Sequence, residues 1–120
     1  MREIKFRVWD TESKIMFDWD GTQKWWEDVG YHDNMFRGNH YVPMQYTGLK
    51  DSEGTEIYEG DIVKYRNNLY QVKWVFFSFY IHRIDGRILK KLEEIAIDEK
   101  GMELIGNIYE NPELLKTTYE

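Results

Sequence analysis

Alternation of apolar and polar residues at the start of the chain predicts a β-hairpin. In the segment 3–10, Ile4, Phe6 and Val8 fall on one face and charged side chains on the other, which is typical of a half-buried strand. The polar residues "TESK" then favour a turn. The segment "IMFDW", residues 15–19, has the apolar character of a returning strand that completes the hairpin.

The alternation is lost between residues 20 and 40, which contain three glycines and many polar turn formers. Thr22 is placed to cap a short helical turn that would carry Trp25, Trp26 and Val29. The remainder of this segment has the pattern of a long loop. Loops of such length in compact domains tend to be either functional or disordered.

The stretch from residue 41 to residue 65 has the clearest turn signals. Pro43 suits an edge strand or the start of a strand. Gly54 is expected to adopt a positive φ in a hairpin turn. Asp61 is placed to accept hydrogen bonds from backbone N–H groups of the preceding turn. The strand "EGDIVKY" is followed by the turn "RNNL" and the strand "YQVKWVFF", and consecutive antiparallel strands of this kind build small barrels.

The C-terminal third begins with the pair Asp85-Gly86, a strong short-range hairpin signal. Segment 87–97 is ambiguous, because its start is compatible with a strand while its apolar residues recur at helical spacing; we favour a short helix or turn. "MELIGNIY" predicts a late strand. "NPELL" predicts the start of a short helix, with Asn111 at the N-cap and Pro112 at the first helical position.

The segment "KWVFFSFYIHR", residues 73–83, is aromatic at five of its eleven positions. As one continuous strand it would be apolar on both faces. One face would hold Trp74, Phe76, Ser78 and Tyr80, and the other Val75, Phe77, Phe79 and Ile81. An ordinary half-exposed strand has one apolar face. Three explanations remain open: the protein covers both faces itself, a bulge or bend near Ser78 resets the register, or one face meets a partner.

Composition narrows the class of protein. The chain has 120 residues, which corresponds to about one domain, and 17% of them are aromatic, a high fraction. Cysteine is absent, which excludes disulfides, thiolate catalysis and cysteine-based metal sites. No apolar run approaches the length of a membrane helix, and the N-terminus lacks the apolar core of a signal peptide. We therefore expect a soluble intracellular protein with no membrane partner.

The net charge of −6 is unevenly distributed. Residues 1–60 carry 12 acidic and 7 basic side chains, residues 61–91 carry 2 and 7, and residues 92–120 carry 8 and 2. The basic block also contains the aromatic segment. Such a local patch can steer a partner towards an otherwise acidic protein. The simpler alternative is that the three blocks neutralise one another on one surface.

Three blocks of the sequence are similar to the YopX family of phage and prophage proteins. They are "MREIKFRVWD", "MQYTGLKDSEGTEIYEGDIVKY" and "LIGNIYENPELL", which occur in that order over most of the chain. The resemblance implies a mainly β fold with minor α content, including a small, partly open Src homology 3-like barrel. It also implies a bacterial cytoplasmic setting. Because the family has no known function, the resemblance brings no activity, cofactor or catalytic residue. A single domain over residues 1–120 is expected.

Candidate chemistry is sparse. Carboxylates gather near the long loop, with His32 and His40 among them: Asp18, Asp20, Glu27, Asp28 and Asp33. Their spacing matches no metal motif, so a solvated acidic loop is the simpler interpretation. The carboxylates of the central hairpin suit turns and edges, and His82 lacks the partners of a nucleophilic triad. We therefore expect no enzymatic activity, catalytic residue, metal or cofactor.

The leading hypothesis is a non-enzymatic phage or prophage accessory protein that acts by binding another protein, of phage or host origin, or by self-assembly into a homo-oligomer. The alternative is a nucleic-acid-binding module that uses the basic aromatic segment 61–91, in which aromatic side chains stack on bases and cations hold phosphates. The candidate binding residues are Lys64, Tyr65, Lys73, Trp74, Phe77, Tyr80, Arg83, Trp25 and Trp26.

Overall fold

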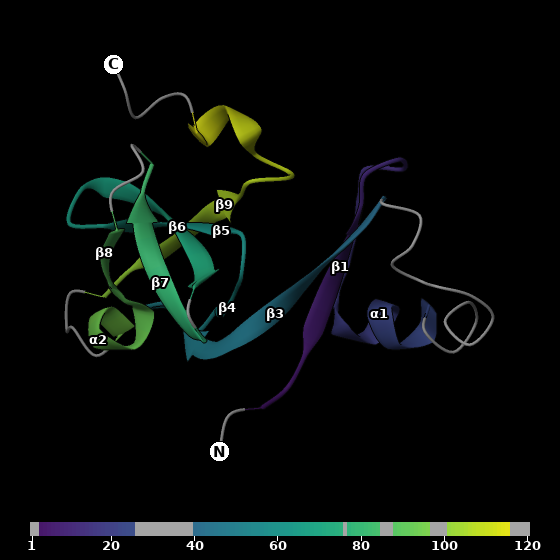
Figure 1. Ribbon diagram of the computed structural model, residues 1–120, viewed down its shortest axis with the longest axis horizontal. Helices are drawn as coiled ribbons and strands as arrows, with labels where there is room; N and C mark the ends of the chain where they lie inside the picture. The colour runs from purple at the N-terminus through teal and green to yellow at the C-terminus, as the bar shows by residue number, and fades with distance from the viewer. Residues whose placement is uncertain (1–2, 26–39, 76, 85–87, 97–100, 116–120) are drawn as a thin grey trace. The chain divides into compact units, whose positions relative to one another are not determined.

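The computed structural model describes residues 3–25, 40–75, 77–84, 88–96 and 101–115 (Figure 1). The fold is mainly β, as predicted, with two antiparallel sheets and a few short helices. The strand orders are β2-β1-β3-β4 and β8-β7-β6-β5-β9. The chain divides into two compact units, residues 1–46 and 47–120. Whether these fold as the single domain expected from the sequence stays a prediction.

The first unit is built on the predicted N-terminal hairpin of β1 (Phe6–Asp10) and β2 (Ile15–Phe17). Strand β1 also pairs with the first half of β3 (Tyr41–Lys50), with Val8 opposite Pro43. Val8 and Trp9 are both buried although they lie on opposite faces of β1. The returning strand is shorter than predicted, because it ends at Phe17 and the chain turns into a helix.

Helix α1 (Trp19–Trp25) confirms the helical turn predicted at the start of the long loop but corrects its cap. The carboxylate of Asp18 accepts a hydrogen bond from the N–H of Gly21 at 2.8 Å, so Asp18 is the N-cap. Thr22 instead lies inside the helix, where its hydroxyl donates to the carbonyl of Phe17. Aspartate suits this end because its charge also favours the positive end of the helix dipole. Residues 26–39, including Trp26, lie outside the described residues.

The second unit contains the predicted meander. It comprises the end of β3 with β4 (Glu56–Tyr58), then β5 (Asp61–Tyr65), β6 (Asn68–Val75), β7 (Ser78–Arg83) and β8 (Ile88–Lys91), and finally α2 (Leu92–Ala96), β9 (Glu103–Asn107) and a 3₁₀ helix, η2 (Pro112–Leu115). Strand β9 returns to pair with β5. The five-stranded sheet curls into a half-barrel (Figure 1). Its core contains Ile57, Val63, Tyr65, Tyr70, Val72, Phe79, Ile81, Leu92 and Met102.

Local turn chemistry follows the sequence closely. Gly54 has a φ of +88° in the turn between β3 and β4, as predicted. Arg66 and Asn67 both have positive φ, which is the signature of the type I′ turns that join two-residue hairpins. The predicted role of Asp61 is also confirmed: its carboxylate is buried and accepts a hydrogen bond from the N–H of Tyr58 at 2.7 Å.

The C-terminal segments need two corrections. Segment 87–97 holds both candidate elements in succession, because β8 is followed directly by α2. "NPELL" forms one turn of 3₁₀ helix that begins at Pro112. The side chain of Asn111 accepts a hydrogen bond from the N–H of Asn107, so it caps the preceding turn. Gly106 is required nearby, because a Cβ at that position would collide with Asn111.

Candidate binding surface

The aromatic segment 73–83 is a β-hairpin and not one strand. Strand β6 ends at Val75 and β7 begins at Ser78, with Val75 and Ser78 paired across the hairpin. The chain therefore reverses between Val75 and Ser78. The sequence left open a bulge or bend near Ser78 that resets the register; the structure has a full reversal of the chain there, so the prediction of one strand was wrong. Phe77 adopts a positive φ in this turn, where glycine or asparagine would be the usual signal.

The reversal sorts the segment into one apolar and one polar face. Val72 and Ile81 lie opposite each other and are fully buried in the core. On the other face, Lys73 lies opposite Tyr80, and both are half-buried. Because residues paired across a hairpin share a face, the apparent doubly apolar strand becomes an ordinary sheet with one face in the core.

Phe77 is the most exposed large hydrophobic residue in the described part of the chain, at 88%. Its φ is +64°, a conformation that non-glycine residues adopt rarely and that costs roughly 1–2 kcal/mol. Because the Phe77 ring lies in water, burial within the monomer does not offset this backbone strain. Such strain is a reason to suspect a functional role.

Trp74 extends the apolar surface beside Phe77. It is 39% exposed, and its ring meets that of the buried Phe79 edge to face with centroids 4.6 Å apart. This geometry is favourable for aromatic pairs. Packing against Phe79 therefore holds Trp74 in place while leaving part of its ring accessible.

The remaining predicted residues do not converge on this end of the hairpin. Tyr65 is 6% exposed and its ring lies in the core. Arg83 lies opposite Tyr70, at the far end of the hairpin from Phe77, and donates a hydrogen bond to Asn68. Lys64 is exposed on β5. Trp25 ends α1 in the other unit, and Trp26 lies outside the described residues.

Several of the described carboxylates accept hydrogen bonds from the backbone, among them Asp18, Asp51 and Asp61. Asp51 accepts hydrogen bonds from the N–H groups of Glu53, Thr55 and Leu104. Burial raises its pKa, but these bonds outweigh burial and hold the pKa below its ordinary value. Within the described ranges, no three His, Asp or Glu side chains are grouped as metal ligands. Glu27, Asp28, His32 and Asp33 lie outside those ranges.

His82 is buried at the polar face of the hairpin, opposite Gln71. Its Nε2 atom has no hydrogen-bond partner among the described residues. Burial, and secondly the positive charge of Lys73, lower the pKa of His82 below its ordinary value. The ring is therefore kept neutral by its surroundings.

Comparison with known proteins places this chain in a family. The model of the family described as YopX protein matches residues 5–116, nearly the whole chain. The chain belongs to the YopX family. It is also similar to the crystal structure of protein EF1440 from Enterococcus faecalis, with a TM-score of 0.65 and 27% sequence identity. The similarity covers 96% of this chain and 99% of that one. A comparison with curated proteins found no significant match.

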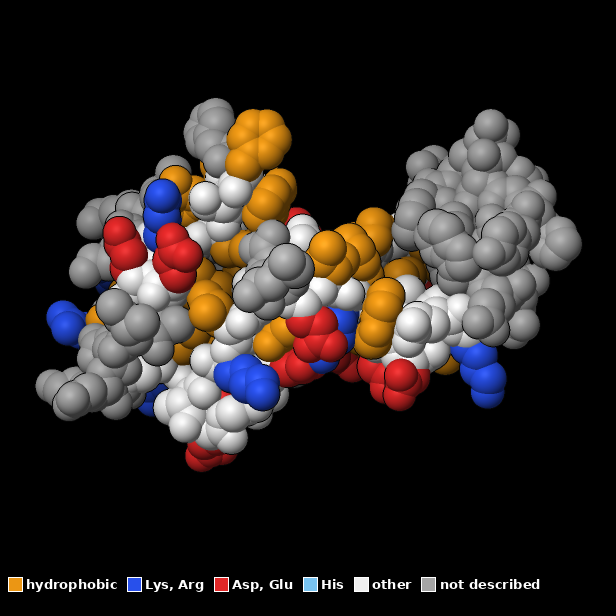
Figure 2. All heavy atoms as spheres, turned by 90° about the horizontal axis from the view of Figure 1, so that it is seen from below, with side chains coloured by type: hydrophobic (Ala, Val, Ile, Leu, Met, Phe, Trp, Pro, Cys, Tyr) orange, Lys and Arg blue, Asp and Glu red, His pale blue; other side chains and the backbone are white. Residues whose placement is uncertain are grey.

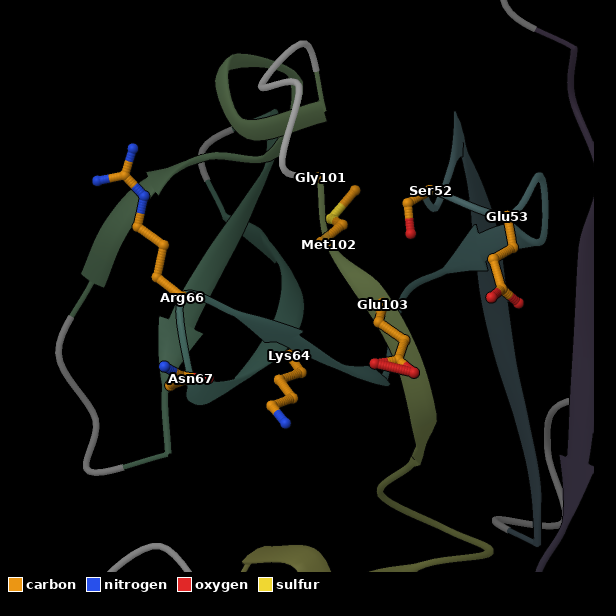
Figure 3. A pocket seen from close by; sticks show the side chains of 8 residues that line it. All are labelled: Ser52, Glu53, Lys64, Arg66, Asn67, Gly101, Met102 and Glu103. Carbon is orange, nitrogen blue, oxygen red and sulfur yellow. The ribbon is translucent and has the colours of Figure 1, made fainter.

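A polar hollow of about 560 Å³ lies on the second unit of this YopX chain (Figure 3). It is lined by Ser52, Glu53, Lys64, Arg66, Asn67, Gly101, Met102 and Glu103. Lys64 and Glu103 lie opposite each other on β5 and β9, whereas Arg66 extends away from Glu103 in Figure 3. The lining contains two cations and two carboxylates, so its net charge favours neither an anionic nor a cationic ligand.

On the face shown in Figure 2, hydrophobic side chains reach the surface in patches interrupted by polar and charged groups, outside the grey residues.

Sequence reasoning missed one residue beside the hairpin, Lys91, which lies on β8 and pairs with Tyr80. The sequence did contain a signal for the position of Lys91. Counting outward from a two-residue turn at Asp85-Gly86 places residue 91 opposite residue 80.

None of the helices in the described part of the chain has the length and apolar character needed to cross a bilayer.

Proposed function

We propose that this YopX-family protein is a non-enzymatic binding module that recognises another protein through the end of the β6–β7 hairpin. The observation that carries the proposal is Phe77, an aromatic ring that is 88% exposed on a strained backbone. Trp74 adds accessible ring surface beside it. Exposed aromatic residues of this kind are enriched at the centres of protein interfaces, where they contribute most of the affinity.

The rigidity of the hairpin supports this proposal. Binding costs conformational entropy when loops and side chains become ordered, and an element that is already ordered avoids much of that cost. Phe77 sits on a two-residue turn between strands whose pairs are formed up to Val75 and Ser78. Trp74 is held by Phe79. Strand pairing thus fixes the backbone on both sides of Phe77, and the contact with Phe79 fixes Trp74.

The roles of the described carboxylates support a non-enzymatic protein. Asp18 caps α1, Asp51 binds three backbone N–H groups, and Asp61 fixes the start of β5. Each of these side chains stabilises the fold, which explains its presence without catalysis. The phage or prophage origin and the bacterial cytoplasmic setting belong to the same proposal and rest on the family resemblance.

A protein partner is favoured over nucleic acid by the burial of the aromatic residues. Non-specific binding of single strands uses several aromatic side chains along one basic face. Tyr65 and Tyr70 are in the core, and Trp74 lies on the opposite face of the hairpin from Lys73 and Tyr80. The cations and accessible rings of segment 61–91 are thus divided between two faces.

Quantitative affinity capture from bacterial lysate tests the proposal. The bait proteins are the wild type, Phe77→Ser, and the matched control Ile4→Ser, which also replaces an exposed apolar residue. We expect at least one protein to be retained by the wild type and the control but lost by Phe77→Ser. Equal retention by all three folded baits would reject the proposal. Light scattering over a dilution series identifies a second copy of the chain as the partner, through a mass that Phe77→Ser lowers.

A further inference from the structure

Three side chains form a row across the face of the hairpin that points away from the core. Lys73 on β6 lies opposite Tyr80 on β7, and Tyr80 lies opposite Lys91 on β8. Directly opposed residues share a face, with Cβ atoms about 4.5–5.5 Å apart. The tyrosine therefore lies between two lysines, and we call these three residues the lysine row.

Among the described residues, no acidic side chain pairs with the lysines of the row. Lys73 is half-buried and Lys91 is exposed, and neither forms an ion pair within the described part of the chain. The field of Lys73 acts on His82, whose pKa it lowers in addition to burial. Two ammonium groups beside an aromatic ring form a site for an anionic group, because each can donate charge-assisted hydrogen bonds.

The surrounding strands contribute no negative charge of their own. Strands β6, β7 and β8 contain no Asp or Glu, although the whole chain has a net charge of −6. Asp85, between β7 and β8, lies outside the described residues, and the carboxylates that follow β8, Glu93 and Glu94, belong to α2. That helix packs its Leu92 into the core beside Phe79 and Ile81, on the face opposite to the lysine row.

We propose that the lysine row binds a carboxylate-bearing segment of the partner protein, while Phe77 provides the apolar contact to the same segment. This inference rests on the proposed function and specifies the chemistry of its partner. Tyr80 lies in β7 and follows Phe77, in the turn before this strand, by three residues, which corresponds to at most about 10 Å at 3.3 Å per residue. The partner segment should therefore present a carboxylate and an apolar side chain on one face at about that separation, two or four residues apart if extended or two turns apart if helical.

The choice of an acidic protein segment over a nucleic acid follows from the small number of rings on this face. Tyr80 is the one aromatic residue of β6 and β7 that shares the face of Lys73. A strand of nucleic acid would also extend beyond the row, where it would meet a protein of net negative charge. A short acidic segment with an apolar anchor matches both the charge of the row and the exposed ring at the tip.

Selection from a displayed library of random peptides of about 12 residues tests this inference, because that length spans both contacts in an extended chain. The targets are the wild type, the double variant Lys73→Gln/Lys91→Gln, Phe77→Ser, and the control Lys14→Gln, which replaces an exposed lysine of the other unit. We expect peptides selected on the wild type to carry Asp or Glu at a constant spacing from an aromatic or aliphatic residue. The synthetic peptides should bind the double variant at least about tenfold more weakly, and the control equally well.

Several outcomes would overturn the inference. Peptides without acidic enrichment, no enriched peptides, or equal affinity for the double variant would each do so. Binding of an oligothymidylate of about 20 nucleotides that depends on both lysines would assign the row to nucleic acid. A dimer dispersed by the double variant would assign it to a second copy. Loss of binding on Phe77→Ser without any effect of the lysine changes would leave the proposed function intact and reject the lysine row alone.

Discussion

Trp74 lies directly opposite Phe79 across the β6–β7 hairpin, and their rings meet edge to face with centroids 4.6 Å apart. Phe79 is 7% exposed and belongs to the core of the second unit, whereas Trp74 is 39% exposed. The pair therefore connects the core to the surface beside Phe77. Through this contact the packing of the core positions the apolar end of the hairpin.

A double-mutant cycle with Trp74→Ala and Phe79→Ala should reveal this coupling. We expect a coupling free energy of about 0.5–1.5 kcal/mol, the range for aromatic pairs. Phe79→Ala alone should cost about 3–5 kcal/mol because it leaves a cavity in the core, and Trp74→Ala should cost less because its ring is partly in water. Urea unfolding of the four proteins measures these values. Effects that add within about 0.5 kcal/mol would show that the rings are independent.

Phe77→Asn should stabilise the protein. Asparagine tolerates a positive φ better than phenylalanine, so the change should relieve about 1 kcal/mol of backbone strain. Little burial is lost, because Phe77 is 88% exposed. Chemical denaturation measures the gain, and Phe77→Ala is the control, since alanine gains no tolerance of positive φ. A variant no more stable than the wild type would indicate that the ring packs in the monomer.

Asp51 should make stability sensitive to acid. Hydrogen bonds from the N–H groups of Leu104, Thr55 and Glu53 overcome the effect of burial and lower its folded-state pKa below 3.8. The stabilisation is then complete above pH 3.8 and is lost as the pH falls through the lower folded-state pKa. Asp51→Asn should cost about 1 kcal/mol above this range and flatten the acid limb of the stability curve.

Urea unfolding as a function of pH measures this difference, with Glu53→Gln as the control on the same exposed turn. A control that flattens the acid limb as much as Asp51→Asn would contradict the assignment to Asp51.

His82 should make the stability of the protein depend on pH in a second range, at higher pH. Burial and the charge of Lys73 lower its folded-state pKa below 6.5, so the unfolded chain binds the proton first as the pH decreases. The stability contributed by the neutral ring is complete above pH 6.5 and is lost as the pH falls towards the folded-state value. The variant Lys73→Gln should raise the pKa of His82 and weaken this loss. Titration of the His82 ring by NMR measures the shift, and a ring that titrates at pH 6.5 in the wild type would rule out this origin.

Local backbone chemistry explains which features could be predicted. The turn at Gly54, the hydrogen bond from Tyr58 to Asp61 and the first helical position at Pro112 depend on residues close together in the chain. Each is governed by side chains that favour one backbone conformation or one near hydrogen bond. The N-terminal hairpin also followed from simple alternation, because β1 and β2 are joined by a short polar turn.

The aromatic segment could not be interpreted in this way. Phe77 carries no turn signal although the chain reverses beside it, so the alternation in the sequence appeared to continue through the turn. Asp18 was overlooked as the cap of α1 for a related reason, since it appeared to lie within a strand. In both places the choice between strand and turn depends on what packs against the residues.

The sequence by itself determined the family, the mainly β class, the strands and most turns, because these depend on local conformational preference and on the order of apolar residues. Only the tertiary structure decided that Tyr65 is buried, that Phe77 is exposed, and that Lys73, Tyr80 and Lys91 form one row. The physical reason is strand pairing: the register across β6, β7 and β8 assigns each side chain to the core or to solvent, and a reversal at a turn without glycine changes that assignment for every residue that follows.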